Sequence, residues 1–245
     1  MRLTLITPYR DRPHHLTHQL AWWETYALKQ AIEWIVIEVT AEPSKGLEQQ
    51  LLQHHVRYLH LACGGPFHKT KALNLGLKHS TGALVTAFDV DLIPLQETLE
   101  RHCFLAENSP YLLVTGYRLM AQTETVDVTK MSQVLDQATL GPEDQPSALR
   151  KYLLKGERFG VMPLFWRDRL LNIGGWDEAF IGWGAEDQDM IERYLTPKQT
   201  LCRCHELVYL HLKHGEASNW NCKTLTARNR DYYYRLRDKP LQTNS

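Results

Sequence analysis

The stretch Ala83–Pro94, with the sequence ALVTAFDVDLIP, decides which fold this chain is expected to adopt. Its first part, Ala83–Phe88, is a short apolar run with β-branched and aromatic residues, which is typical of a strand buried on both faces of a parallel sheet. Two carboxylates, Asp89 and Asp91, follow it. Because open α/β sheets bind ligands beyond the carboxyl ends of their strands, we expect both aspartates at the rim of a binding crevice.

The spacing of Asp89 and Asp91 indicates a cation site. In an extended backbone, residues two apart point to the same face. Two hard oxygen donors side by side suit a divalent cation that carries a diphosphate, because the cation neutralises charge that neither partner could bury alone. The pattern also arises by chance, and the chain contains a second Asp-x-Asp that begins at Asp187. The spacing alone therefore does not establish a cation site, and the surrounding sequence has to be considered as well.

The residues before this stretch alternate between strand and helix patterns. Short apolar runs are separated by polar turns and by segments whose apolar residues recur at helical spacing. This order is the signature of a parallel sheet with helices between its strands. The predicted strands are Leu3–Thr7, Glu33–Val39 and Val56–Leu61, and the predicted helices are His14–Gln30, Lys45–His55 and Phe67–His79.

After Pro94 the pattern is looser. We expect a helix over Pro94–Glu107 and strands over Tyr111–Thr115 and Leu201–Leu212. Between these strands, Met120–Gln145 is polar, which indicates a mobile excursion rather than core. The basic, tyrosine-rich segment Lys223–Lys239 is predicted to be a solvated amphipathic helix, and attachment to an anionic membrane surface is the alternative.

The net charge, the length of the apolar runs and the number of cysteines exclude some classes of protein. The 245 residues carry a formal net charge of zero, which argues against a general nucleic-acid binder. The amino terminus has too short an apolar segment for a signal peptide, and no apolar run reaches the length of a membrane span, so we expect a cytoplasmic protein. Five cysteines, an odd number without a secretory signal, predict free thiols rather than a disulfide framework.

Several separated stretches resemble, in order and spacing, the GT-A glycosyltransferases, and the β-1,4-galactosyltransferases in particular. The amino-terminal half is also similar to the family-two glycosyltransferases. The resemblance implies one α/β domain, a mixed GT-A sheet flanked by helices, with a nucleotide-binding half over residues 1–94 and an acceptor-binding half over residues 95–245. The stretches that carry it are Pro8–Arg12, Phe67–Gly76, Phe88–Pro94, Gly182–Asp189 and His211–His214.

The resemblance assigns one group of residues to the nucleotide. Arg10 and Arg12 would lie against its phosphates, where a planar, permanently charged guanidinium is well suited. Phe67 would stack on the base and Lys69 would hold the phosphates. Without the resemblance, the arginines would be a solvated turn and Phe67 a core residue. The full group is Pro8, Tyr9, Arg10, Arg12, Glu38, Phe67, Lys69, Asn74 and Asp89.

The resemblance also implies a metal site. Its ligands would be Asp91, His211 and His214, and the ion Mn²⁺ or Mg²⁺. The family has methionine at the position of His211. Imidazole is a harder ligand than a thioether, which opens the choice of metal, but manganese or magnesium beside a diphosphate remains the expectation.

The acceptor segment would supply the catalytic base. Asp187 would take the proton of the acceptor hydroxyl while the cation stabilises the departing diphosphate. Glu186 would hydrogen-bond the acceptor. Trp183 would stack on a sugar face, next to Gly184.

Structural explanations compete with these assignments. Cys202, Cys204 and His205 could hold structural zinc together with the downstream histidines, although their spacing matches no familiar zinc finger and an alternating strand would point both cysteines into the core. Acidic residues in the first turn of a helix offset its dipole, and we expect Asp189 to pair with Arg193 one turn later.

The expected activity is transfer of a hexose or N-acetylhexosamine from a UDP-sugar to a glycan or lipid-linked glycan, with inversion at the anomeric carbon. The expected biological role is bacterial surface polysaccharide synthesis. Two alternatives stay open. A nucleotidyltransferase also uses paired aspartates and a cation, but it would need a glycine-rich phosphate loop where this chain has PYRDRP. The other alternative is a sugar-binding protein without catalytic activity.

Overall fold

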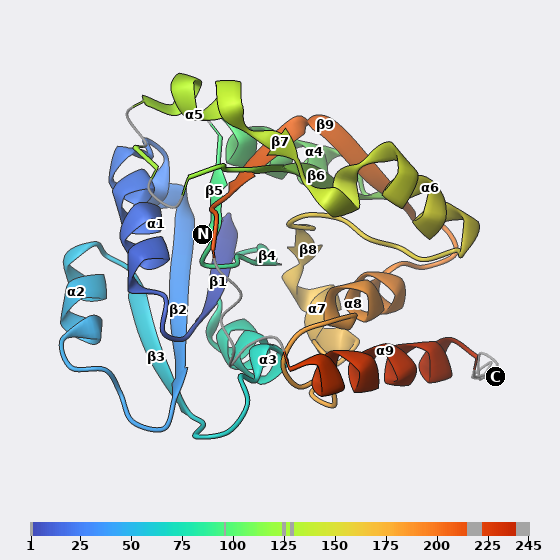
Figure 1. The fold of residues 1–245 in the computed structure, drawn as a ribbon, viewed down its shortest axis with the longest axis horizontal. Coiled ribbons are helices and arrows are strands. Elements are labelled where there is room, and N and C mark those ends of the chain that lie inside the picture. Colours follow the sequence, from blue (N-terminus) through green and yellow to red (C-terminus); the bar gives the residue numbers. More distant parts are fainter. Residues whose placement is uncertain (1, 96, 124–125, 128–129, 215–221, 239–245) are drawn as a thin grey trace.

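The computed structural model describes residues 2–95, 97–123, 126–127, 130–214 and 222–238. Its first sheet has five strands in the order β3-β2-β1-β4-β8 (Figure 1). The first four are parallel to one another, and β8 is antiparallel to β4. The predicted parallel sheet is therefore confirmed. The strands are β1 (Leu3–Tyr9), β2 (Ile32–Thr40), β3 (Arg57–Ala62), β4 (Leu84–Ala87) and β8 (Phe165–Trp166).

Three helices connect these strands, at the predicted places. They are α1 (Pro13–Thr25), α2 (Leu47–Gln53) and α3 (Lys69–His79). Pro13 starts α1 because a helix leaves the N–H of its first residue unused. Helix α3 lies directly on the sheet at Gly76, where an added Cβ would be 2.3 Å from Ile6 Cγ2.

Alternate residues of β2 enter two separate cores, as expected for a strand covered on both faces. Trp34 and Val36 pack with the apolar face of α1, whereas Ile35 and Ile37 pack with α3. The indole N–H of Trp34 donates to Thr7 Oγ1 at 2.9 Å, so its one polar atom is satisfied in the core.

A second sheet brings the carboxyl-terminal strand to the end of β4. Its order is β5-β9-β6-β7, with β9 antiparallel to β5 and parallel to β6. Leu92 of β5 pairs with His211 of β9, and the N–H of Leu212 donates to Asp91 O at 2.7 Å. This pairing sets His211 beside Asp91. The strands are β5 (Leu92–Pro94), β6 (Leu112–Met120), β7 (Thr139–Leu140) and β9 (Thr200–His211).

Two expectations for this half are wrong. The helix expected from Pro94 begins only at Thr98, as α4 (Thr98–Asn108), because residues 92–94 form β5. The segment Met120–Gln145 is not outside the core. It contains α5 (Met131–Gln137) and β7, and its Ala121 and Val126 are both 4% exposed and pack with the first core.

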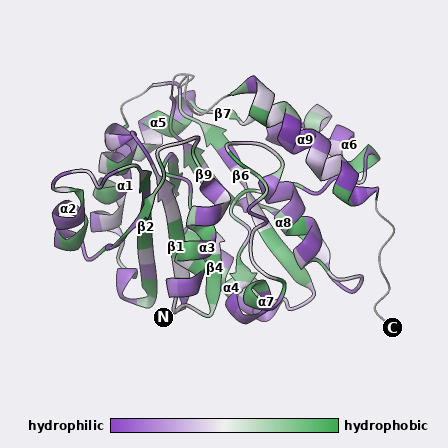
Figure 2. Cartoon of the chain, turned by 90° about the horizontal axis from the view of Figure 1, so that it is seen from below, coloured by the Kyte–Doolittle hydropathy of each residue, from purple (hydrophilic) through white to green (hydrophobic). Residues whose placement is uncertain are grey.

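The remaining helices surround the second sheet and the end of the first. They are α6 (Pro146–Leu154), α7 (Arg167–Asn172), α8 (Glu186–Tyr194) and α9 (Lys223–Arg237). Hydrophobic residues dominate the central strands, and hydrophilic residues dominate outer helices such as α9 (Figure 2). All five cysteines are free thiols, as predicted. Among the described helices, none combines the length and the apolar character that crossing a membrane requires.

Candidate active site

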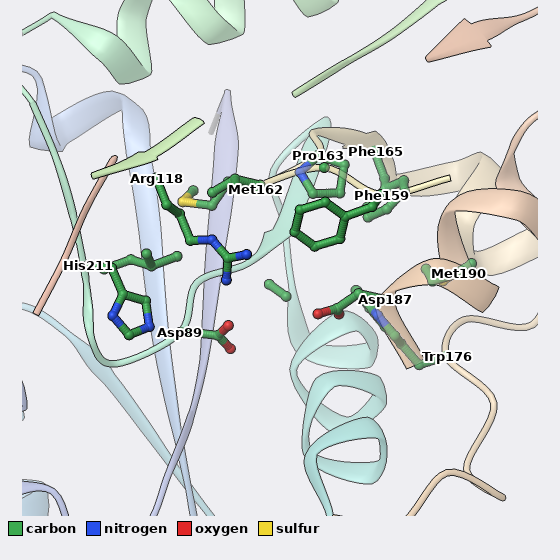
Figure 3. A pocket seen from close by; sticks show the side chains of 14 residues that line it. Asp89, Arg118, Phe159, Met162, Pro163, Phe165, Trp176, Asp187, Met190 and His211 are labelled. Atoms are coloured by element: carbon green, nitrogen blue, oxygen red, sulfur yellow. The ribbon is translucent and has the colours of Figure 1, made fainter. Parts of the chain in front are cut away.

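A cleft opens where the two sheets and α8 meet. Asp89, Arg118, Asp187 and His211 turn toward a common space, although they come from four different elements or connections (Figure 3). The cleft measures about 530 Å³ when the open space at its mouth is included. Past Asp187 it continues into a second cleft, of about 810 Å³ measured in the same way. The second cleft is bordered by α6 and α9, and Tyr152, Trp183, Thr226, Arg230 and Tyr234 are among the residues that line it.

Asp89 and Asp91 do not share one face. The chain turns between them, and the N–H of Leu92 donates to Asp89 O at 3.0 Å. The extended backbone on which the common face depended is therefore absent, and that expectation is wrong. Asp91 faces the histidines at the end of β9, whereas Asp89 faces Lys69.

Asp91, His211 and His214 gather as a possible metal site. One ligand atom from each lies within 4.8 Å of the others. His211 Nε2 is 3.6 Å and His214 Nε2 is 3.4 Å from the Asp91 carboxylate, and Arg12 Nη1 is 2.9 Å away. Burial would raise the pKa of Asp91, but the two histidines and Arg12 outweigh it and lower the pKa. The carboxylate is thus kept ionised.

This donor set fits a divalent cation. A carboxylate and two imidazoles are ligands that manganese and similar ions accept. His211 Nδ1 is buried and has no hydrogen-bond partner among the described atoms, so a local hydrogen bond does not explain why this imidazole is here. The predicted assignment of these three residues as ligands stays a prediction.

Lys69 joins the two sides of the cleft. Its ammonium group lies 3.3 Å from Asp89, 3.2 Å from Glu186 and 3.2 Å from Asp187, and its side chain is 8% exposed. Burial raises the pKa of Asp89 and of Asp187, and the attraction of Lys69 lowers both but does not cancel the effect. One buried cation therefore holds three carboxylates that come from two distant parts of the sequence.

Arg10, which follows β1, holds the loop that contains Phe67 and leads into α3. The Arg10 guanidinium donates to Gly65 O at 2.8 Å, to Cys63 O at 2.9 Å and to Val39 O, and it lies 5.5 Å from the centre of the Phe67 ring. Phe67 is 4% exposed and belongs to the second core. Stacking of Phe67 on a base would require the ring to become exposed, so that role stays a prediction.

Other residues assigned to the nucleotide are also bonded within the protein. Glu38 is fully buried and accepts hydrogen bonds from Ser44 and, at 2.5 Å, from the hydroxyl of Tyr58. Burial alone would raise its pKa, but these bonds lower it. Asn74 exchanges two hydrogen bonds of 2.8 Å with the backbone of Trp176. Pro8 and Tyr9 are buried in β1. Their contact with a nucleotide stays a prediction.

The acceptor segment forms a turn and the start of α8. Gly184 has φ +118°, which only glycine adopts readily, and its N–H donates to Glu186 Oε2 at 2.8 Å. This turn leaves Trp183 53% exposed at the second cleft. Asp189 pairs with Arg193 at 2.8 Å, as predicted, so it is held away from the chemistry assigned to Asp187.

Comparison with known proteins places the chain in a family. The model of a family described as "Glycosyl transferase family 2" matches residues 30–171, which is more than half of the chain. The chain belongs to glycosyl transferase family 2. A second model, described as the N-terminal domain of galactosyltransferase, matches residues 147–215 of this glycosyltransferase.

Relatives among characterised proteins are distant. Human beta-1,4-galactosyltransferase 4 is 23% identical over 197 residues, covering 77% of this chain and 41% of the relative. Human beta-1,4-galactosyltransferase 3 is 24% identical over 199 residues, covering 78% of this chain and 37% of the relative. The glycosyltransferase therefore spans about two fifths of the length of these relatives.

Solved structures agree with the fold class. A mannosyltransferase from Pyrobaculum calidifontis, in complex with GDP-Man and Mn²⁺, aligns with a TM-score of 0.64 at 16% identity and covers 98% of this chain and 65% of its own. TarS of S. aureus aligns with a TM-score of 0.62 at 14% identity and covers 87% of this chain and 37% of its own. The predicted GT-A fold is confirmed.

Arg118 is a residue of the cleft that the sequence did not single out. It extends from β6, lines both clefts and pairs with Glu143. The predicted strand ended at Thr115, and an alternating pattern carried on to Met120 would have shown Arg118 on the strand. His15 was missed as well, and its Nε2 lies 3.2 Å from Lys213 O, beside the histidine pair.

Among the described residues, no cluster that contains a cysteine supports the zinc alternative. Within the described ranges, Asp91, His211 and His214 are the only three His, Cys, Asp or Glu residues whose ligand atoms all lie within 4.8 Å of one another. Cys202 and Cys204 are half-buried on β9, and Cys204 packs against the first core. Packing therefore explains Cys204, and neither cysteine belongs to a possible metal site in the part of the chain that the structure describes.

Proposed function

We propose that this glycosyltransferase moves a hexose or N-acetylhexosamine from a UDP-sugar to a hydroxyl group of a glycan, with inversion and with a divalent cation. The observation that carries the proposal is the convergence on one cleft of a possible cation site, a buried lysine and the carboxylate of Asp187. The proposal treats the chain as one domain, in which residues 1–94 bind the donor nucleotide and residues 95–245 bind the acceptor.

The cation would be Mn²⁺ or Mg²⁺, held by Asp91, His211 and His214. When bound, it would supply positive charge to the diphosphate leaving group. Asp91 is suited to this role because its lowered pKa keeps it ionised in the absence of a cation. Support for manganese comes from the Pyrobaculum mannosyltransferase, whose complex contains Mn²⁺.

Asp187 would be the general base. It lies at the junction of the two clefts, where a donor and an acceptor would meet. Its raised pKa makes it a better proton acceptor than an ordinary aspartate, because a base is most effective when its pKa is near the working pH. A base on the acceptor side favours a single displacement, and hence inversion at the anomeric carbon.

Lys69 and Asp89 would serve the donor. With a diphosphate in the first cleft, the Lys69 ammonium group has an anionic partner besides the three carboxylates. Uridine is the nucleoside supported by a TarS structure in complex with UDP-GlcNAc, whereas the Pyrobaculum complex contains GDP-Man. The donor panel below separates these two nucleotides.

The second cleft would hold the acceptor. Trp183 offers an exposed ring on which a sugar could stack, and Tyr152 and Tyr234 line the same cleft. The acceptor would be a glycan, free or lipid-linked, in the synthesis of bacterial surface polysaccharide on the cytoplasmic side of the membrane.

A donor panel tests the proposal. Release of nucleoside diphosphate from UDP-sugars and GDP-mannose is measured with Mn²⁺, with Mg²⁺ and with chelator, beside two variants. We expect UDP release that requires the cation, loss of donor binding in Asp91→Ala, and normal donor binding without turnover in Asp187→Asn. Release of pyrophosphate from nucleoside triphosphates would point to a nucleotidyltransferase instead. Glycan binding that is unchanged in Asp187→Asn, without turnover of any donor, would point to a sugar-binding protein.

A further inference from the structure

Helix α6 carries an exposed face that combines leucines with basic residues. Leu153 and Leu154 are 79% and 77% exposed, more than any other large hydrophobic residue that the structure describes. Arg150 and Lys151 lie one turn earlier and are exposed, and Lys155 at the end of the helix is exposed as well. We call these five residues the α6 face. Two adjacent leucines in water are unfavourable unless something covers them.

The charge around the α6 face is mainly positive. Helix α6 and its C-cap Lys155 contain three basic residues and no acidic one, and α9 with its C-cap Asp238 contains five basic residues and two acidic ones, Asp231 and Asp238. The chain as a whole is neutral, so these two helices concentrate its basic charge. The nearby Glu157, whose side chain is 5% exposed, lies 3.8 Å from Lys155 Nζ and accepts a hydrogen bond from the hydroxyl of Tyr234 at 2.5 Å, so it offsets part of the charge of Lys155 but is itself buried.

The α6 face is fixed at the border of the second cleft. Arg237 of α9 donates to the backbone oxygen of Gly156 at 2.9 Å, which joins the carboxyl-terminal ends of α6 and α9. Tyr152 of α6 and Tyr234 of α9 line the cleft between them. In Figure 1, α6 lies above α9 on the same side of the molecule, and Figure 2 shows both helices at one edge.

We propose that the α6 face, with the neighbouring basic residues of α9, docks this glycosyltransferase on an anionic lipid surface. Leu153 and Leu154 enter the boundary between headgroups and acyl chains, and the basic residues are attracted to anionic headgroups. Nucleic acid or an acidic protein would match the charge, but nucleic acid offers the leucines no apolar layer. The further statement that docking aligns the second cleft with acceptors at that surface rests on the proposed function.

Vesicle sedimentation tests the docking. The full chain is mixed with vesicles of phosphatidylcholine and phosphatidylglycerol, or of phosphatidylcholine alone. We expect binding to the anionic vesicles only, weakened by added salt. The double variant Leu153→Ser/Leu154→Ser should bind about tenfold or more weakly, and so should Arg150→Gln/Lys151→Gln. Matched controls are Leu52→Ser on α2, where the leucine is 69% exposed, and Arg101→Gln on α4, and both should bind like the parent.

Four results would overturn the docking proposal. They are no binding of the parent to anionic vesicles, equal binding to neutral vesicles, an equal loss in Leu52→Ser, and a change of oligomeric state in the leucine variant with vesicle binding intact. Circular dichroism checks that each variant is folded. The α6-face variants should release UDP from a soluble donor at the parent rate. If the parent releases no UDP while vesicle binding behaves as expected, the proposed function fails and the docking stands.

Discussion

Lys69 Nζ lies 3.2 Å from Asp187 Oδ2 and thereby ties the start of α3 to the first turn of α8. The same ammonium group contacts Asp89 and Glu186, so the lysine is the shared counter-ion of carboxylates on both sides of the cleft. Without it, three carboxylates would face one another in a confined site. The ionisation of Asp187 therefore depends on a residue that comes more than a hundred positions earlier in the sequence.

Replacing Lys69 by methionine should shift the pH profile. Lys69 lowers the pKa of Asp187, so its removal raises that pKa further. A general base acts when it is deprotonated, and the acid limb of the kcat/KM profile should therefore move to higher pH, with activity near neutral pH reduced about tenfold or more. Lys69→Arg should move the limb less, and Lys71→Met, at an exposed position of the same helix, should leave it in place. If the acid limb of the kcat/KM profile is at the same pH in Lys69→Met as in the parent, this result would argue against Asp187 as the base.

Removal of Asp91 should weaken cation binding directly. Calorimetric titration of the donor-free protein with Mn²⁺ gives a readout that does not depend on turnover. Asp91→Asn loses the charged ligand and should bind Mn²⁺ at least about tenfold more weakly. Asp168→Asn is the matched control, because the Asp168 side chain on α7 is 93% exposed and far from the histidines in sequence. Equal affinity in the two variants would remove Asp91 from the ligand set.

Gly76→Ala should destabilise the fold. The added Cβ would lie 2.3 Å from Ile6 Cγ2 and 3.0 Å from Ile37 Cδ1, so α3 would have to move away from the sheet. Overpacking of this kind costs about 1–3 kcal/mol in the free energy of unfolding. Gly65→Ala is the control, since nothing lies within 4 Å of an added Cβ there. Urea denaturation that gives both variants the same midpoint would contradict the close packing of α3.

His102 should make stability depend on pH. It is fully buried, lies 2.6 Å from the hydroxyl of Tyr209 and 2.9 Å from Val114 O, and burial lowers its pKa to about 4. The unfolded chain binds this proton below about pH 6.5, whereas the folded chain resists it down to about 4. The contribution of His102 is therefore complete above about pH 6.5, and up to about 3 kcal/mol is lost as the pH falls to about 4.

Two variants isolate this effect in urea denaturation across that pH range. His102→Gln removes the titrating group, and its free energy of unfolding should fall less steeply with decreasing pH than that of the parent. Leu99→Ala also destabilises α4 but keeps His102, so it should keep the parent slope. If His102→Gln and Leu99→Ala have the same slope, protonation of His102 does not contribute.

The first sheet could be predicted because its signals are local. Apolar runs such as Leu3–Thr7 and Glu33–Val39 are buried on both faces and need no distant partner to be recognised. The helix predicted over Pro94–Glu107 exists, but its start was placed too early for the opposite reason. Residues 92–94 are a strand only because β9, more than a hundred residues later, pairs with them. Short segments such as Leu92–Pro94 take their structure from partners that the local sequence does not contain.

The sequence selected residues that gather in the cleft, but it did not predict how all of them are arranged there. The resemblance selected Asp91, His211 and His214, and the structure brings them together. It did not indicate the turn that separates Asp89 from Asp91, since one backbone hydrogen bond decides it. The polar composition of Met120–Gln145 hid the buried Asp144, whose charge is matched by Arg118 and Arg203.

The possible cation site forms only when β9 pairs with β5 in the correct register. Two of the three possible ligands, His211 and His214, lie at the end of β9 and just after it, and the pairing of β9 with β5 sets His211 opposite Leu92. A slip by one residue would turn His211 to the other face of the sheet and separate it from Asp91. A nascent chain that ends before Thr200 could already complete strands β1 to β4, yet it would contain only one ligand. Cation affinity should consequently appear only after synthesis has passed the last strand, and it would report that this strand has joined the sheet in register.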